Sequence, residues 1–366
     1  MRIVAVILFA VLLYIPQEPP AELLTTEFIN VPSTASSHGM AESGVSLVDF
    51  GLQGINPATI GLAAVESKAA VSFTPVYNRP YAVQLTDASA LHFAGMYGKP
   101  LLEKGGKPVV TAGLAYSFTR FKIPYWLYRT PDYEQLTQHR LTLSVASLGV
   151  ADVSIGATII YNRFSEKYGT TLGASGKGSG VALDLGALFR YRAYTTPDER
   201  ISLIPAFGVS YLSLGPDVTY KYELSAFGQR DLVLTRRFKA GGSFTLETPF
   251  GLPNCLVSVD YDTRIHDVHD DFKFWRLGAA AGLTDMATVR FGSLVHDDMN
   301  PLQSWGFTLV PTAWIRFIMG PNNVDNGDGS LLRQIDVKVE YSKCEEEYSY
   351  PLTNGHWLNI SLVWQR

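Results

Sequence analysis

The sequence predicts an all-β fold: a 14-stranded antiparallel transmembrane β-barrel with an N-terminal plug (hatch) segment. Three observations predict it, namely the composition, a ladder of alternating segments, and an irregular apolar stretch before that ladder. Charged residues are 17% of the chain, against ~25% in soluble proteins, while aromatic residues reach 12% and glycines number 32. Few charges with many aromatic and glycine residues suit a lipid-facing barrel.

The N-terminus has the features of a secretory signal. Arg2 supplies a positive charge, and Ile3–Ile15 is an unbroken apolar run of 13 residues. This run is shorter than the ~20 residues that a membrane helix needs. We therefore predict a signal peptide over residues 1–21 and an exported chain. An uncleaved anchor is the alternative, because Ala21 follows two prolines and makes a poor cleavage site.

Residues 22–66 form the predicted plug. The stretch His38–Ala64 is rich in glycine and weakly charged, too irregular for one helix and too apolar for a solvated linker. It contains the motif Asn56-Pro57-Ala58, in which Asn56 can hold a tight turn through its own side chain and Pro57 fixes φ. A fourteen-stranded barrel has a lumen too wide for wall side chains to fill. We expect this segment to fill it; the alternative is a surface turn before a strand.

Residues 67–366 form the predicted barrel. The strands are long, ~10 residues or more, as tilted membrane strands must be. In Ile335–Tyr341 every second residue is apolar and the others are charged. A secreted β-sandwich is the alternative. The predicted strands cover residues 68–77, 89–98, 108–119, 139–149, 152–164, 180–193, 200–213, 234–247, 255–264, 272–283, 285–294, 304–317, 333–343 and 355–365.

The connections should alternate between long outside loops and short periplasmic turns. Residues 120–138, 165–179 and 214–233 fit the long outside class. Residues 318–332 break the rule, because a periplasmic turn is expected there and the segment is long. Either the strand count is wrong by one hairpin or this turn has a role of its own.

The alternation places charges of both signs on the inner face of the barrel. They form either a polar conduit or seat for the plug, or salt bridges that brace the wall. The predicted lumen residues are Asp184, Arg190, Arg237, Lys239, Asp260, Asp262, Arg264, Arg276, Arg290, Arg316, Asp336, Lys338 and Glu340.

Two outside regions are candidate ligand sites. Residues 121–133 are aromatic, and Tyr125, Trp126 and Tyr128 either capture an apolar ligand or belong to an interface girdle. Histidine and carboxylate side chains could hold a divalent metal ion at the rim, although no spacing matches a zinc signature and solvated rim loops are the alternative. These residues are His266, Asp267, His269 and His296.

The N-terminal motifs followed by the ladder carry a resemblance to a known family. Phe28–Met40, Gly44–Leu47 and Asn56-Pro57-Ala58 precede the first strand in the order typical of the FadL-type outer-membrane barrels. Within that superfamily the chain resembles the PorV/PorQ branch more than the fatty-acid transporters proper. It departs from the family motif at Thr59-Ile60, where Gly-Leu is usual, which puts the subfamily in doubt more than the fold.

The resemblance implies an outer-membrane protein that is not an enzyme and has no cofactor. It implies a docking or structural component of a type IX-like secretion or surface-attachment system, with secreted or secretion-system proteins as partners. The alternative is a FadL-like passive transporter of hydrophobic compounds, with a hydrophobic small molecule as ligand. Either barrel would lie in a lipid bilayer. The net charge of −4 gives no reason to expect nucleic acid.

Overall fold

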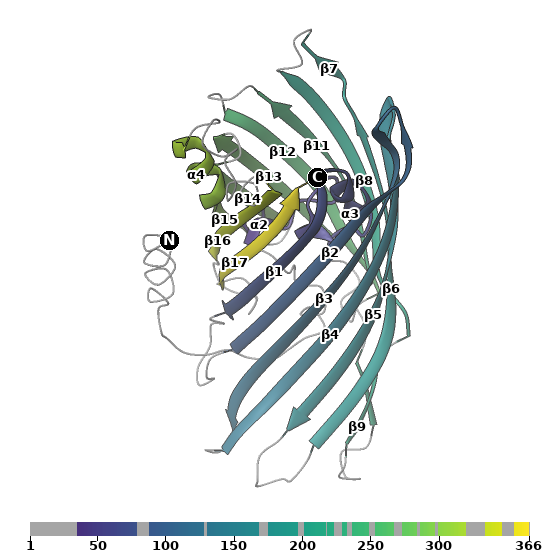
Figure 1. The fold of residues 1–366 in the computed structure, drawn as a ribbon. Helices are drawn as coiled ribbons and strands as arrows, with labels where there is room; N and C mark the ends of the chain where they lie inside the picture. The colour runs from purple at the N-terminus through teal and green to yellow at the C-terminus, as the bar shows by residue number, and fades with distance from the viewer. Residues whose placement is uncertain are drawn as a thin grey trace.

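Segments of alternating residues pair into one antiparallel sheet in the computed structural model (Figure 1). The predicted signal peptide and the start of the predicted plug, residues 22–34, lie outside the described residues. The structure describes residues 35–78, 88–127, 130–167, 175–196, 201–216, 218–222, 229–232, 236–248, 253–266, 273–283, 286–296, 299–319, 334–345 and 355–365.

The sheet closes into a barrel because the first strand pairs with the last, with Ala70 opposite Val363. Within the described residues the wall has fourteen strands, as predicted. They are β1 (Ser67–Asn78), β2 (Ala88–Lys104), β3 (Lys107–Leu127), β4 (Thr130–Ser147), β5 (Ala151–Lys167), β6 (Ser175–Tyr191), β8 (Ser202–Leu214), β11 (Arg236–Glu247), β12 (Pro253–His266), β13 (Lys273–Leu283), β14 (Ala287–His296), β15 (Met299–Leu309), β16 (Ile335–Glu345) and β17 (Gly355–Gln365). Three short strands, β7 (Tyr194–Thr195), β9 (Val218–Tyr222) and β10 (Gln229–Leu232), extend the wall near β6, β8 and β11.

The alternation along each strand is inverted relative to a soluble protein. On β4, Leu141 and Leu143 are 49% and 58% exposed, whereas Thr142 and Ser144 are 0% and 1% exposed. Large apolar side chains therefore face outward and small polar ones face the lumen, which is the pattern of a membrane barrel. A secreted sandwich would bury the apolar face between two sheets, so this alternative was wrong.

The wall is taller on one side than on the other. Strands β2 to β6 have 17 to 21 residues, whereas β13 to β17 have 10 or 11. A tilted strand needs ~9–11 residues to cross a bilayer. The long strands, which sweep across the front and right of Figure 1, therefore continue past the height of the short ones.

Several expected loops are strand. Leu127 of β3 pairs with Thr130 of β4, so most of residues 120–138 form a hairpin. Strands β5 and β6 likewise extend into residues 165–179, and β9 and β10 lie within residues 214–233. The bilayer sets a minimum strand length but no maximum, and the backbone hydrogen bonds continue beyond it.

The expected strand over residues 304–317 was also wrong in its second half. Strand β15 ends at Leu309 and is followed by helix α4 (Pro311–Met319). Pro311 suits the first helical position, where its missing N–H costs nothing. This helix begins the long connection that broke the expected pattern of turns. Among the described residues no helix is long and apolar enough to cross a membrane.

Three short elements precede the barrel: α2 (Ala35–Gly39), the 3-10 helix η2 (Phe50–Leu52) and α3 (Thr59–Glu66). Figure 1 places α2 and α3 within the ring of strands. Helix α3 contacts β2, β3, β4 and β5, and α2 contacts β14, β15 and β16. Residues 35–66, called the N-terminal segment below, thus cross the barrel from one wall to the other.

Candidate functional site

The candidate site is the contact between the N-terminal segment and the inner wall. The segment is deeply buried, with Val45, Asn56, Ile60 and Leu62 all at 0% exposure. It has little regular structure, so its backbone groups need partners from the wall. Where those partners lie determines what holds the segment in place.

The Asn56-Pro57-Ala58 motif forms a tight turn against β5 and β6. The Asn56 side-chain carbonyl accepts a hydrogen bond from the Ala58 N–H at 3.0 Å, and its amide donates to the Val45 carbonyl at 2.6 Å. The same amide donates to the Ala187 carbonyl of β6 at 3.1 Å. From β5, the Ser154 hydroxyl donates to the Ala58 carbonyl at 2.6 Å. One asparagine therefore ties the turn to itself, to the rest of the segment and to the wall.

Glycines in the wall allow this close approach. A Cβ on Gly186 would lie 2.9 Å from Pro57 Cδ and even closer to the Asn56 side chain. A Cβ on Gly156 would collide with the backbone of Pro57. Other wall glycines touch the segment in the same way: Gly98, Gly113, Gly208, Gly278 and Gly292. The wall is thus shaped to the segment on both sides of the lumen.

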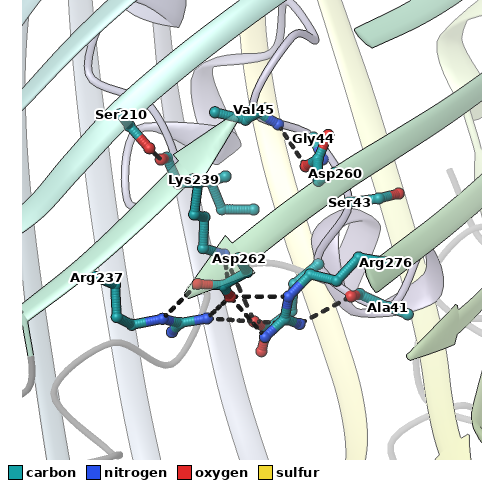
Figure 2. Close-up of polar contacts among 12 residues, drawn as sticks. Ala41, Ser43, Gly44, Val45, Ser210, Arg237, Lys239, Asp260, Asp262 and Arg276 are labelled. Atoms are coloured by element: carbon teal, nitrogen blue, oxygen red, sulfur yellow. Dashed lines mark hydrogen bonds and ion pairs between the residues drawn. The ribbon is translucent and has the colours of Figure 1, made fainter. Parts of the chain in front are cut away.

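An ionic cluster holds the segment on β11, β12 and β13 (Figure 2). Arg276 donates from Nε to Asp262 at 3.0 Å and from Nη1 to the Ala41 carbonyl at 2.9 Å. Its Nη1 also lies 2.8 Å from the Glu42 carboxylate, which is 3.9 Å from both Arg237 and Lys239. Arg237 and Lys239 both pair with Asp262. Three cations therefore share one carboxylate from the wall and one from the segment.

Asp260 adds a second anchor beside this cluster. One of its oxygens accepts hydrogen bonds from the Gly44 and Val45 N–H groups at 2.6 and 2.9 Å (Figure 2). Next to it, the hydroxyls of Ser43 and Ser258 lie 2.8 Å apart. Residues 41–45 are thus held by several hydrogen bonds to β12 and β13. Those to Asp260 and Arg276 involve charged groups and are therefore stronger than hydrogen bonds between neutral groups.

Two further polar groups line the lumen. Arg140 on β4 pairs with Asp184 on β6, which also accepts from the Ser213 N–H at 2.7 Å. Glu340 on β16 accepts from Asn359 at 2.5 Å and lies 3.7 Å from Arg290. Each of the two ion pairs joins strands across the one between them, as the salt-bridge alternative for the lumen charges expects.

The remaining predicted lumen residues lie elsewhere. Arg190 pairs with Asp152 at 3.0 Å and lies 3.6 Å from Glu66 at the end of α3. Asp336 accepts hydrogen bonds from Arg316 of α4 at 2.5 Å and from Gln365 at 2.7 Å, so it anchors helix α4 to β16. Lys338 is half-buried on β16.

The rim candidates fall largely outside the described part of the chain. His266 and His296 end β12 and β14, while Asp267 and His269 lie outside the described residues. Tyr125 and Trp126 belong to β3 and not to a loop, and Tyr128 lies outside the described residues. Among the described residues, no group of three or more His, Cys, Asp or Glu side chains could hold a metal ion. The metal and ligand-capture hypotheses stay predictions.

The predicted site omits two residues that the structure brings to it, Glu42 and Arg140. Alternation alone could have found Arg140, because it shares the inner face of β4 with Thr142 and Ser144. No pattern in the sequence singles out Glu42. Its role depends on a contact across more than two hundred residues of chain.

Comparisons with known proteins define the class of fold. No family model matches the chain, and no curated protein matches it. The Ralstonia pickettii toluene transporter TbuX aligns with a TM-score of 0.52 at 12% identity, over 91% of this chain and 97% of that one. A Pseudomonas aeruginosa FadL homologue aligns with a TM-score of 0.49 at 11% identity, over 91% and 98% of the two chains. For the Pseudomonas putida toluene transporter TodX the TM-score is 0.48 at 9% identity, over 90% and 96%.

At such low identity the likeness to TbuX is one of fold. The predicted barrel fold is confirmed at that level. The narrower assignment to the PorV/PorQ branch has no support in these structures.

Proposed function

We propose that this chain is an outer-membrane channel through which hydrophobic compounds pass passively, and that its N-terminal segment is the plug. The observation that carries the proposal is the apolar contact between the segment and one side of the lumen. Phe50 and Ile60 lie in a buried cluster with inward-facing residues of β1, β2, β3 and β17. These wall residues are Ala70, Ala94, Met96, Ala115 and Val363.

This apolar side differs from the ionic side formed by β11, β12 and β13. On the apolar side the segment meets the wall mainly through van der Waals contact, and a hydrocarbon could replace such contact at little cost. On the ionic side, separation would remove the Glu42 carboxylate from three buried cations, which costs several kcal/mol by an order-of-magnitude estimate. We therefore place the path for a hydrophobic compound along the apolar side, with the segment staying attached to the ionic side.

The fold and the outer surface support the location. The outward face is apolar on strand after strand, and a barrel of this kind belongs in an outer membrane. TbuX, which shares the fold, is a toluene transporter. The docking role in a type IX-like secretion system, which was the first reading of the sequence, becomes the alternative.

Uptake by whole cells tests the transport role. The chain should be expressed in a Gram-negative host that lacks its own transporter for hydrophobic compounds. We expect faster uptake of radiolabelled oleate or toluene than in cells carrying the empty vector. The matched control is a chain with Asn56→Ala and Pro57→Ala at the same outer-membrane abundance, in which only the plug turn is altered and the uptake rate should change.

Uptake equal to the empty vector for both compounds would contradict transport. The docking alternative predicts that outcome together with a protein that co-purifies with the barrel. Native mass spectrometry of the purified barrel therefore separates the two roles: a retained lipid or hydrocarbon supports the channel, and a retained protein supports docking.

A further inference from the structure

Helix α4 is amphipathic and lies at the rim of the short side of the barrel (Figure 1). It links β15 to β16 at the end of the barrel where β1 begins and β17 ends, which is the periplasmic end in the expected topology. The wall itself does not need it, because two antiparallel strands can be joined by a turn of two residues. Helix α4 is therefore an addition that the connection between β15 and β16 does not require.

One face of α4 is fixed to the barrel by polar contacts. Arg316 donates to Asp336 at 2.5 Å, and the Thr312 hydroxyl donates to the same carboxylate at 3.3 Å. The backbone N–H of Val337 donates to the Thr312 oxygen at 3.1 Å. Thr312 and Arg316 are four residues apart and so share a face. This face points at β16, and the orientation of the helix is set.

The opposite face is apolar and partly exposed. Trp314, Phe317 and Ile318 are 38%, 55% and 78% exposed. Their spacing of three and four residues places them together on the side away from Thr312 and Arg316. The helix has no acidic residue in its first turn, and its basic residue Arg316 is engaged with Asp336. Nothing charged interrupts the exposed apolar face.

This face continues the lipid-facing surface of the wall. The base of the helix sits on the end of β14, where Met286, Val310 and Ala313 form a buried cluster. The Trp314 indole N–H donates to the Met286 carbonyl at 3.2 Å. On the adjoining outer wall, Phe291 of β14 is 61% exposed and Leu309 of β15 is 38% exposed. Exposed apolar side chains therefore lie both on the strands next to the helix and on the helix itself.

We propose that α4 lies in the periplasmic interface of the membrane, with Trp314, Phe317 and Ile318 inserted among the lipid chains. The strands beside it have 10 or 11 residues, just enough to cross the bilayer, so a helix at their end lies at interface depth. A tryptophan with an apolar ring and a satisfied N–H is typical of that depth. An amphipathic helix with such a face binds in the interface plane. The inference rests on the proposed membrane location of the barrel.

Site-directed spin labelling tests this placement. Both native cysteines are first replaced, as Cys255→Ser and Cys344→Ser, and single cysteines are then introduced for labelling in phosphatidylcholine vesicles. The test site is Ile318→Cys, with Phe317→Cys as a second site on the same face. Ile155→Cys on the outer face of β5 is the lipid control, since Ile155 is 63% exposed. Lys104→Cys, at the exposed tip of the β2–β3 hairpin, is the water control.

We expect the label at residue 318 to behave like the lipid control. Its accessibility to oxygen should exceed that to a water-soluble nickel chelate several-fold, and the order should reverse at residue 104. High nickel accessibility at 317 and 318 would overturn the proposal, because the face would then lie in water. Low accessibility to both reagents would also overturn it, because protein would then cover the face. If residue 155 also fails to behave as a lipid site, the membrane location itself is wrong.

Discussion

At the scale of single residues, Arg276 is the centre of the contact that seats the N-terminal segment. Ala41 and Glu42 both have left-handed backbones, with φ of 50° and 61°. Such a conformation costs a non-glycine residue ~1–3 kcal/mol. Arg276 donates to the Ala41 carbonyl and pairs with Glu42, while Asp262 holds the same guanidinium. The arginine thus helps to offset the backbone strain of these two residues.

Removing the charge of Glu42 should loosen the segment. In Glu42→Gln, Arg237, Lys239 and Arg276 would lose one of the two carboxylates that they share in the described part of the chain and would keep Asp262. A hydrogen bond to a charged group is worth ~1.5–3 kcal/mol, which corresponds to about a ten- to hundred-fold shift in the equilibrium for release of the segment. Single-channel recording in planar bilayers should therefore show more frequent openings than in the native chain.

Glu66→Gln is the matched control for this charge. Glu66 belongs to the same segment, but its side chain is 63% exposed and 3.6 Å from Arg190. Exposed pairs contribute ~0–1 kcal/mol, so the opening frequency should stay close to that of the native chain. Equal behaviour of the two variants would show that the ionic cluster does not hold the segment.

A methyl group on the wall should displace the Asn56-Pro57-Ala58 turn. In Gly186→Ala, the new Cβ would meet both Asn56 and Pro57. Overpacking of this kind costs ~1–3 kcal/mol. We expect a higher open probability in bilayer recordings and a lower melting temperature. Gly242→Ala is the control, because its nearest neighbour, the Ala206 carbonyl, would be 3.6 Å away. A native open probability in Gly186→Ala would rule out the turn as the point of closure.

At this scale the sequence indicated which wall residues face the lumen but not which ones meet. Alternation identified Asp260, Asp262 and Arg276 as inward-facing, and all three contact the segment or its anchor. Alternation specifies a face only, and says nothing of the height of a residue in the barrel or of its opposite neighbour. That is why Glu42 and its partners could not be paired from the sequence.

At the scale of elements, the wall is interrupted between β6 and its neighbour. Strand β6 pairs with β8 from Arg190 to Leu183, and the register shifts between Leu185 and Leu183. Pairing resumes with β9 only at Lys177 and Gly176. At the register shift, Ser213 takes a left-handed φ of 60°, and its N–H donates to the Asp184 side chain. Few backbone hydrogen bonds between described residues resist separation of the wall here, so we infer that it can part at this point.

A disulfide across this interruption should slow uptake if the wall parts there. A Cβ at Gly180 would lie 3.7 Å from the Val218 Cβ, within the range of ~3.5–4.5 Å that a disulfide requires. We therefore expect the oxidised Gly180→Cys/Val218→Cys variant to take up oleate several-fold more slowly than the reduced one. The two single-cysteine variants control for the substitutions themselves. Identical uptake before and after reduction would mean that the compound does not pass between these strands.

The sequence predicted the strands well and the helices poorly, for a physical reason. Strands with one face toward lipid and one toward the lumen must alternate, as β12 and β16 do, so their signal is strong. Helix α3 is buried nearly all round and has no polar face to mark a helical period. Residues 311–317 of α4 fit both a period of two and a helical period, and only the contacts with Asp336 and Met286 decide between them.

At the scale of the whole molecule, the lumen has an ionic side and an apolar side. The ionic side lies on β11, β12 and β13 and holds residues 41–45, while the apolar side lies on β1, β2, β3 and β17 and receives Phe50 and Ile60. Release of the segment from the apolar side alone would open a path while the charges stay paired. A segment attached on one side only can move and return without leaving the barrel.

Deletion of residues 38–60 should therefore convert the barrel into an open pore. The ionic cluster loses Glu42 and the wall loses the turn at Asn56, yet the closing contact between β1 and β17 does not involve the deleted residues. We expect a barrel that still forms, judged by its circular dichroism, with a steady conductance well above that of the native chain and greater sensitivity to detergent. Glu42→Gln should give brief openings to a smaller conductance, because its segment remains tethered. If the deletion and the native chain conduct alike, the segment does not close the lumen.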